Sequence, residues 1–311
     1  MRVFVAGACG AMGRPLVRRL VAAGHEVTGT TRREERAEGI RAAGAAAAVC
    51  DVYDDDALAD AVAGASPEVV VHALTALPDR IDWKAKEDPL AATNRLREEG
   101  TRNLIGAARA AGARRVIGES VAFLYEPSGE WIKDEDAPLF TDAPGRAGDA
   151  VAALADLEGQ VLEAEGIEGV VLRFGWFYGP GTSYARDRAQ AEDFRRRRFP
   201  IVGRGTGVFS FIHVEDVADA TLAAVDGDVV GVFNVVDDDP ARQREWAPVY
   251  AEAVGAKRPR RAPLWLAKLI AGPVALTAVE LRGASNARAK RELGWQPRYP
   301  SWRQGFREAL G

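Results

Sequence analysis

Three glycines near the start of the chain have the spacing of a loop that binds phosphate groups. Gly7, Gly10 and Gly13 follow the apolar residues 3–6 directly, and a stretch with helical periodicity begins at Arg14. Glycines let the backbone turn tightly and approach a ligand closely, while the N-terminus of the following helix adds free N–H groups and a positive dipole end. The arrangement predicts that the pyrophosphate of a dinucleotide binds to Gly7, Cys9, Gly10, Ala11, Met12 and Gly13.

The residues expected at the end of the second strand indicate which dinucleotide binds. A carboxylate there would bind the adenosine 2′-hydroxyl of NAD. The sequence instead has Thr30-Thr31-Arg32-Arg33. Two guanidinium groups can hold a 2′-phosphate by paired hydrogen bonds, which favours NADP (NADPH) as the cofactor. The alternative is that both arginines only expose their charges to water at a helix start. We expect further cofactor contacts from Thr31 and, after the third and fourth strands, from Asp51, Val52, Leu74, Thr75 and Ala76.

The elements that must position these residues alternate along the first half of the chain. Short apolar runs predict strands over residues 3–6, 26–30, 47–50, 69–73, 115–120 and 170–174. Alanine-rich periods predict helices over residues 14–23, 34–43, 55–63, 94–111 and 150–165. Strands without polar alternation are covered on both faces, so the predicted fold is α/β, with a doubly wound parallel sheet of the Rossmann type. Ligands bind at the carboxyl edge of such a sheet.

The pattern changes after Phe174. Turn residues, a charged helix, a strand over 209–213, a helix over 214–225 and a strand over 232–235 precede a helical region with several prolines. We therefore predict a cofactor-binding domain from residues 1–175 plus 208–235. A smaller, mostly helical substrate lobe would comprise residues 176–207 plus 236–311, interleaved with that domain.

Several further segments carry a resemblance to a known family. They are Gly100-Thr101-Arg102-Asn103-Leu104, the run from Leu172 to Gly181, Phe211-Ile212-His213-Val214-Glu215-Asp216-Val217 and Glu292-Leu293-Gly294-Trp295. With the glycine loop, they resemble the extended short-chain dehydrogenase/reductase superfamily, of the NAD(P)-dependent epimerase/dehydratase type, along nearly the whole chain. The resemblance implies that the loop after the sixth strand lines the cofactor and substrate pocket, through Phe174, Gly175, Trp176 and Phe177.

The catalytic residues of that family are missing from the expected places. The family uses a Tyr-x-x-x-Lys pair, which exchanges a proton with the substrate oxygen, and a Ser or Thr that holds this oxygen. Counting back from Glu158 puts Ala150 at the tyrosine position and Leu154 at the lysine position. Val121 stands at the usual Ser or Thr position, and Arg97 replaces an asparagine. The chain therefore resembles an atypical branch of the superfamily.

Two other side chains are our candidates for the catalytic role. Ser120 ends the fifth strand, next to the expected position, and Tyr178 follows the sixth strand. Either could instead be structural, with Ser120 bonded to nearby backbone and Tyr178 packed in the core. Tyr125 and Tyr184 are weaker candidates. We interpret His72 as a core residue and His213 as a hydrogen-bonded residue at a helix start.

Composition excludes several classes of partner. With 41 basic and 45 acidic side chains the net charge is −4, so no general attraction to nucleic acid or anionic lipid is expected. Two cysteines and three histidines are too few and scattered for a disulfide scaffold or a structural metal site. The longest apolar run, residues 264–279, is too short and interrupted to span a membrane, and we expect a buried or substrate-facing helical segment there. We expect a cytoplasmic protein; the sequence leaves open whether it forms a homodimer.

The leading functional hypothesis is an NADP-dependent oxidoreductase that acts on a small carbonyl or hydroxyl compound with a non-standard proton donor. A sugar-nucleotide epimerase or dehydratase is an alternative within the enzymes. A third hypothesis is a non-catalytic NADP-binding sensor or regulatory protein, which loss of the Tyr-x-x-x-Lys pair favours. Apolar and aromatic residues in the second lobe favour a ligand pocket instead.

Overall fold

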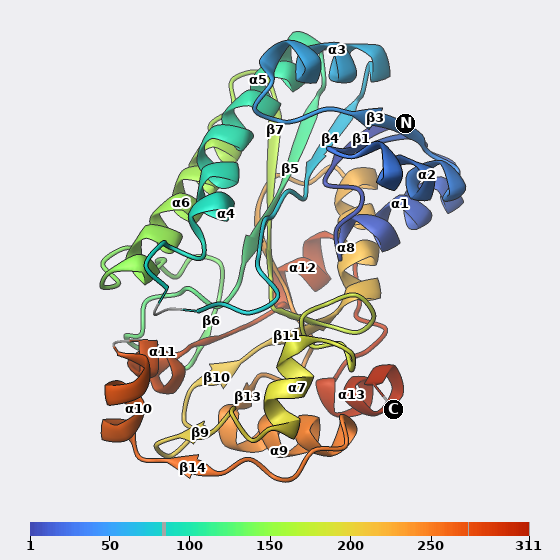
Figure 1. Cartoon of the computed structure of the whole chain (residues 1–311). Helices are drawn as coiled ribbons and strands as arrows, with labels where there is room; N and C mark the ends of the chain where they lie inside the picture. The colour runs from blue at the N-terminus through green and yellow to red at the C-terminus, as the bar shows by residue number, and fades with distance from the viewer. Residues whose placement is uncertain (83–84, 273, 311) are drawn as a thin grey trace.

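A parallel sheet of seven strands organises the computed structural model, which describes residues 1–82, 85–272 and 274–310 (Figure 1). The strand order is β12-β7-β5-β4-β1-β2-β3, and every neighbouring pair is parallel. The predicted α/β fold with a doubly wound parallel sheet is confirmed. The strands are β1 (Arg2–Ala6), β2 (Glu26–Thr31), β3 (Ala46–Val49), β4 (Val69–His72), β5 (Arg115–Val121), β7 (Glu168–Phe174) and β12 (Gly231–Val235).

Helices cover both faces of this sheet, which explains why its central strands are apolar throughout. One face packs against α1 (Gly13–Ala22), α2 (Glu34–Ala42) and α8 (Val214–Asp226), with Leu16 and Val217 in its core. The other face packs against α3 (Asp55–Ala65), α5 (Thr101–Ala110) and α6 (Arg146–Leu162). Each predicted helix of the first half is present, with boundaries shifted by a few residues.

The predicted helix over residues 94–111 differs most from expectation. It consists of α4 (Ala91–Arg95), a π-helical turn η1 (Leu96–Gly100) and α5. A π turn holds more residues than an α turn and so rotates the side chains within it relative to the rest of the helix. In η1, Arg97 is buried, and its guanidinium donates a 3.5 Å hydrogen bond to Asn94 Oδ1.

A second core lies below the carboxyl edge of the sheet (Figure 1). It is built largely from aromatic residues, among which Trp246 packs against the rings of Phe209 and Phe211. The strand predicted over 209–213 divides at Ser210. β11 (Phe211–His213) pairs with β8 (Trp176–Tyr178), whereas β10 (Val208–Phe209) pairs with β13 (Ala241–Arg242). The other elements here are α7 (Ala189–Arg195), β9 (Ile201–Val202), α9 (Gln243–Ala253), β14 (Arg261–Ala262) and α13 (Trp302–Leu310). The division into two interleaved lobes stays a prediction.

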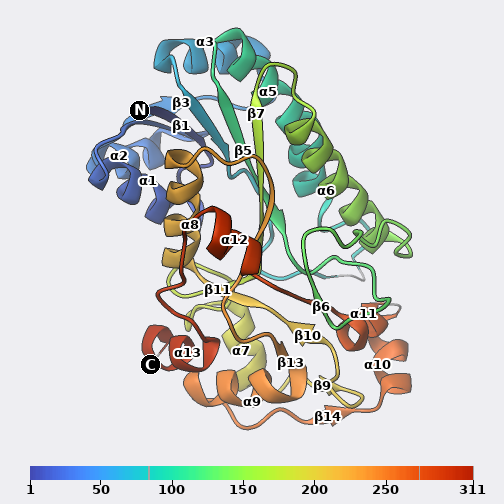
Figure 2. The same cartoon turned by 180° about the vertical axis from the view of Figure 1, so that it is seen from behind.

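The remaining elements connect the two cores. β6 (Ile132–Lys133) pairs with β15 (Gly283–Ala284), and α12 (Ala287–Glu292) lies against the sheet beside α8 (Figure 2). The apolar run 264–279 forms α10 (Leu264–Ala271) and α11 (Val274–Glu280). Trp265 and Leu269 on α10 are 68% and 76% exposed, so these two side chains are not buried, and the alternative of a substrate-facing segment stays a prediction. Within the described residues, every helix is too short or too polar to cross a membrane.

Candidate active site

A cleft of about 260 Å³ opens at the carboxyl edge of the sheet, where the ends of β1, β4 and β5 meet. Parallel strands bring the loops that follow them to one edge, so residues far apart in sequence meet there. The cleft is lined by Gly10, Ala11, Met12, Ala73, Thr75, Leu77, Pro78, Asp79, Glu119, Phe177, Gly181, Thr182, Ser183 and Arg188.

The glycine loop has the shape needed to receive a pyrophosphate. Gly7 has a φ of +94°, and a Cβ there would lie 2.3 Å from the carbonyl oxygen of Ala73. A Cβ on Gly13 would lie 2.2 Å from the oxygen of Gly7, so both glycines allow close packing of loop, helix and strand. At Gly10 an added Cβ would approach only that same oxygen, at 3.3 Å, and the residue faces the cleft. The free N–H groups at the start of α1 complete a site that fits a phosphate.

Cationic side chains gather at the end of β2. Arg32, Arg33 and Arg36 border a surface depression at the start of α2, which Glu34 and Glu35 also line. All three arginines are exposed, and none forms an ion pair with any residue that the structure describes. Sequence reasoning missed Arg36, although its position one helical turn after Arg33 could have indicated it. Thr31 is buried, and its hydroxyl oxygen accepts a hydrogen bond from the backbone N–H of Arg33. The Cys9 thiol donates to the carbonyl oxygen of Arg36, at 3.6 Å.

The residues predicted after the third and fourth strands divide between two environments. Thr75 lines the cleft, whereas Leu74 and Ala76 pack against the core on the α5 side of the sheet. Val52 is buried in that core, and the Asp51 carboxylate accepts a hydrogen bond from the backbone N–H of Tyr53. Thr75 is thus the member of this predicted set that lies in the cleft.

The loop after β7 places one of its four predicted residues at the cleft, namely Phe177. Phe174 is buried in the sheet core, and Trp176 stacks on Phe123 with ring centroids 4.1 Å apart. A Cβ on Gly175 would lie 2.5 Å from the carbonyl oxygen of Ser210, so glycine allows the close packing there.

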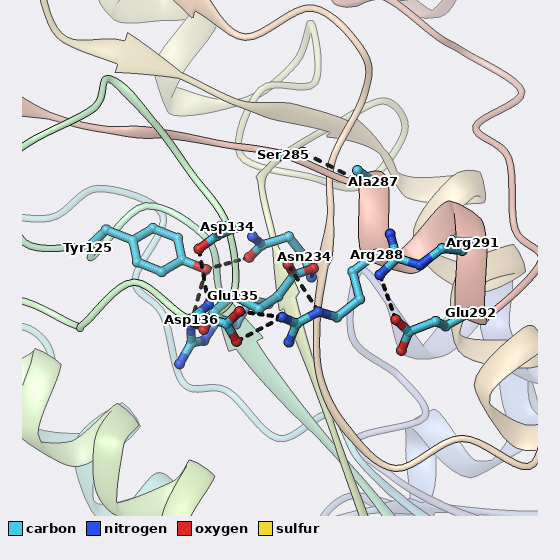
Figure 3. A network of polar contacts seen from close by, with 11 residues as sticks. Tyr125, Asp134, Glu135, Asp136, Asn234, Ser285, Ala287, Arg288, Arg291 and Glu292 are labelled. Carbon is cyan, nitrogen blue, oxygen red and sulfur yellow. Dashed lines mark hydrogen bonds and ion pairs between the residues drawn. The ribbon is translucent and has the colours of Figure 1, made fainter.

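Ser120 points away from the cleft into a buried polar network. It is 1% exposed, and its hydroxyl donates a 2.6 Å hydrogen bond to Glu158 on α6. Arg173 on β7 donates to both oxygens of the same carboxylate, at 2.8 and 2.6 Å. The network continues through Tyr125 and Asn234, whose side chains are joined by a 2.6 Å hydrogen bond (Figure 3). Ser120 is therefore occupied in holding β5, α6 and β7 together.

Tyr178 also lies away from the cleft. It is 0% exposed and packs edge to face on Phe306, and its hydroxyl has no hydrogen-bond partner among the described residues. Burial and the nearby Asp237 raise the pKa of this phenol above its ordinary range. A hydroxyl in this position has no path to a substrate.

The other candidates from the sequence are structural. Tyr184 is buried in the aromatic core, and burial raises its pKa. His72 Nε2 lies 3.1 Å from the Thr101 hydroxyl, and burial lowers the pKa of this histidine to about 4. His213 accepts the backbone N–H of Glu215 at the start of α8, and burial likewise lowers its pKa to about 4. The interpretation of both histidines as structural residues is confirmed.

Glu119 is an acidic residue of the cleft that sequence reasoning missed. Glu119 lines the cleft, and its carboxyl group accepts no hydrogen bond from any residue that the structure describes. Burial raises the pKa of Glu119 to about 7, although the positive charge of Arg97 acts in the opposite direction. An acidic residue at the end of β5, one position before Ser120, was the signal that could have identified it.

Two ion pairs connect the loops at the rim of the cleft. Arg188, after β8, lies 3.4 Å from Asp79, after β4. Arg80 binds Asp193 on α7 with hydrogen bonds of 3.0 and 2.7 Å. These pairs hold the segment after β4 against the segment that precedes α7.

Comparison with known proteins agrees with this architecture. The model of a family described as the NAD dependent epimerase/dehydratase family matches residues 3–235. A 3-diazoavenalumate denitrifying reductase from Streptomyces sp is 45% identical over 309 residues, which cover 98% of this chain and 99% of the relative. A UDP-glucose 4-epimerase from Mycolicibacterium smegmatis is 30% identical over 322 residues, which cover 96% and 94%.

Solved structures share the fold at lower identity. UDP-glucose 4-epimerase from Thermotoga maritima, solved with UDP-glucose, has a TM-score of 0.77 at 20% identity and covers 100% of this chain and 97% of its own. The human epimerase family protein SDR39U1, solved with NADPH, has a TM-score of 0.74 at 23% identity, with coverages of 100% and 99%. The family model and the full-length reductase relative show that the chain belongs to the NAD dependent epimerase/dehydratase family of enzymes.

Proposed function

We propose that this protein is an NADPH-dependent reductase that replaces the nitrogen pair of an organic diazo compound by hydrogen. The observation that carries the proposal is its 45% identity to a reductase named for denitrifying a diazo compound, across almost the full length of both chains. The reduction would add one hydride and one proton to the diazo carbon and release N₂.

The missing Tyr-x-x-x-Lys pair supports a diazo compound over a carbonyl compound. Carbonyl reduction develops negative charge on oxygen, which positioned hydrogen-bond donors must stabilise. Here Ala150 and Leu154 stand at the tyrosine and lysine positions, and Ser120 is bonded to Glu158. Reduction of a diazo carbon produces no oxyanion, so the protein needs a proton source but no such donors.

The residues of the cleft suit this use of the cofactor. Gly10 and the N-terminus of α1 would hold the pyrophosphate, and the three arginines at the start of α2 would hold the 2′-phosphate of NADPH. The bound cofactor supplies the hydride. Met12, Leu77 and Phe177 line the same cleft and would exclude water from the acceptor.

The test is to mix the purified protein and NADPH with matched panels of diazo and carbonyl compounds, and to incubate the protein separately with UDP-sugars. NADPH absorbance and labelled N₂ from ¹⁵N-diazo compounds would be followed together. We expect NADPH oxidation and N₂ release in equal amounts with at least one diazo compound. NADPH oxidation with carbonyl compounds but not with diazo compounds would show that the protein is a carbonyl reductase. Interconversion of UDP-sugars would establish an epimerase. NADPH binding without turnover of any of these compounds would support the non-catalytic sensor.

A further inference from the structure

Reduction by hydride leaves one proton to be supplied to the substrate, and the cleft contains few groups that could supply it. Three titratable side chains line the cleft within the described part of the chain: Asp79, Glu119 and Arg188. Asp79 is paired with Arg188, and its side chain is 82% exposed to water. Glu119 is left as the cleft-lining acid without an ionic or hydrogen-bonding partner among those residues.

The geometry of β5 directs Glu119 into the cleft. Side chains alternate between the two faces of a strand. Ser120 turns toward α6, where it binds Glu158. The preceding residue therefore turns to the opposite face, where the cleft opens between the glycine loop and Phe177. Glu119 borders the same space as Gly10 and Thr75, from the carboxyl edges of β1 and β4.

The charges around Glu119 suit a group that gains and loses a proton. Burial disfavours its ionised form, while Arg97, on η1, favours that form. Arg97 stands where the family resemblance leads us to expect asparagine, so this departure in sequence acts electrostatically on the acid in the cleft. Of the other charged or titratable groups on the neighbouring elements, His72 on β4 is neutral, Arg173 on β7 is paired with Glu158 on α6, and Asp79 is paired with Arg188 at the rim.

We propose that the carboxyl group of Glu119 delivers the proton for the reduction, in place of the missing Tyr-x-x-x-Lys pair. This inference rests on the reductase function proposed above. The O–H bond of the protonated carboxyl group breaks and a C–H bond forms at the substrate carbon. Glu119 is left as a carboxylate, which the positive charge of Arg97 stabilises. It regains a proton from water after the product has left the cleft.

The first measurement needs no substrate. NMR of side-chain carboxyl carbons in the ¹³C-glutamate-labelled protein, with Glu119→Gln to assign the signal, would give the pKa of Glu119. We expect a value near 7, as burial dictates. A value near that of an ordinary glutamate would overturn the inference, whatever the activity of the protein.

The second measurement is turnover of the diazo substrate at saturating NADPH as a function of pH. Because the protonated acid is the active form, wild-type turnover should fall as pH rises through about 7. Loss of general acid catalysis slows a reaction by at least about 100-fold, so we expect that loss, and no such pH dependence, in Glu119→Gln. Glu119→Asp should recover part of the rate. The matched control is Glu98→Gln, which removes the same charge from an exposed site on η1.

Direct calorimetry of NADPH binding would show whether Glu119→Gln is folded and binds the cofactor. Near-wild-type turnover of this variant would overturn the role of Glu119 and leave the reductase function intact. If Glu119→Gln does not fold, the wild-type titration and the Glu119→Asp pH profile decide: a pH profile without a step near 7 overturns the role. No turnover by the wild type would refute the proposed function, and the proton donor with it.

Discussion

Glu158 holds two partners in the interior, and both bonds are expected to matter for stability. Its carboxylate accepts from Arg173 and from Ser120, and both members of the ion pair are buried. Removing one partner of a buried ion pair leaves an uncompensated charge and costs about 3–5 kcal/mol. We therefore expect Glu158→Gln to lower the free energy of unfolding by about 3 kcal/mol, measured by urea denaturation.

Ser120→Ala should lower the free energy of unfolding by about 1–2 kcal/mol, because it removes only the hydrogen bond to Glu158. A fall in turnover of folded Ser120→Ala would instead restore Ser120 as a catalytic candidate.

Tyr178→Phe gives the opposite expectation. The hydroxyl is buried and has no hydrogen-bond partner among the described residues, and an unsatisfied buried polar group costs about 1–3 kcal/mol. Removing it should leave the unfolding free energy unchanged or raise it, and turnover should be retained. Tyr250→Phe is a suitable comparison, because that hydroxyl donates a 3.0 Å hydrogen bond to the backbone oxygen of Tyr184 and its loss should destabilise the protein. Slower turnover of Tyr178→Phe with unaltered stability would show that the phenol reaches the substrate.

At the scale of elements, substitutions at different glycines of the glycine loop should affect either folding or cofactor binding. A Cβ on Gly10 would lie 3.3 Å from the backbone oxygen of Gly7, which is a tight contact, and the rest of the side chain would enter the cleft. We expect Gly10→Val to fold, with a small loss of stability, and to bind no measurable NADPH by calorimetry. Gly7→Ala should instead be destabilised, because of the positive φ and the clash with Ala73. Normal NADPH affinity in Gly10→Val would mean that this loop has only a structural role.

The start of α2 should determine the choice between NADPH and NADH. Hydrogen bonds to charged groups contribute about 1.5–3 kcal/mol each, so losing the arginine contacts to a 2′-phosphate should weaken NADPH binding by roughly 10- to 100-fold or more. We expect this change in the variant with alanine at 32, 33 and 36, with NADH affinity almost unchanged. Arg109→Ala, at an exposed site on α5, controls for loss of positive charge. An unaltered ratio of the NADPH and NADH affinities would mean that these arginines contact water and not the cofactor.

The elements differ in how far sequence could predict them. The strands and the glycine loop follow from local patterns: apolar runs, turn residues and a helix start. The π turn of η1 carries no such local signal, so the sequence predicts a single helix over residues 94–111. Glu119 escaped notice for another reason. Its importance depends on which face of β5 it occupies and on Arg97, 22 positions earlier, and neither is visible along the sequence. The prediction that Tyr178 lies at the substrate pocket is wrong because α13, from the far end of the chain, covers it.

For the whole molecule, the buried histidines predict loss of stability in acid. Burial lowers the pKa of His72 and His213 to about 4, whereas the unfolded chain has values near 6.5. Protons then bind the unfolded state preferentially, so stability falls as pH drops from about 6.5 to 4, by roughly 3 kcal/mol for each histidine. Glu119 acts oppositely, because its raised pKa makes the folded state the better proton acceptor between about 4.5 and 7. Burial also raises the pKa of the Asp216 and Asp237 carboxyl groups, which therefore oppose the histidines in the same direction.

His213→Asn isolates one of these contributions. Asparagine can still accept the N–H of Glu215 at the start of α8 but does not titrate. We expect urea denaturation of this variant to show a smaller fall in stability between pH 6.5 and 4 than the wild type, by roughly 3 kcal/mol. Identical pH dependence of the two proteins would mean that His213 has the same pKa in the folded and unfolded states.

The core beneath the glycine loop is completed by residues from the end of the chain. Ala289 and Trp295 pack in the same cluster as Val3, Leu16 and Val217. A ribosome adds about 5–20 residues each second, so many seconds separate the appearance of the first strand from that of the tryptophan that covers its core. During that interval the nascent cofactor-binding sheet exposes apolar surface that its own later residues will bury. We therefore expect correct folding of the newly made chain to depend on chaperones that cover this apolar surface until the C-terminal helices have been synthesised.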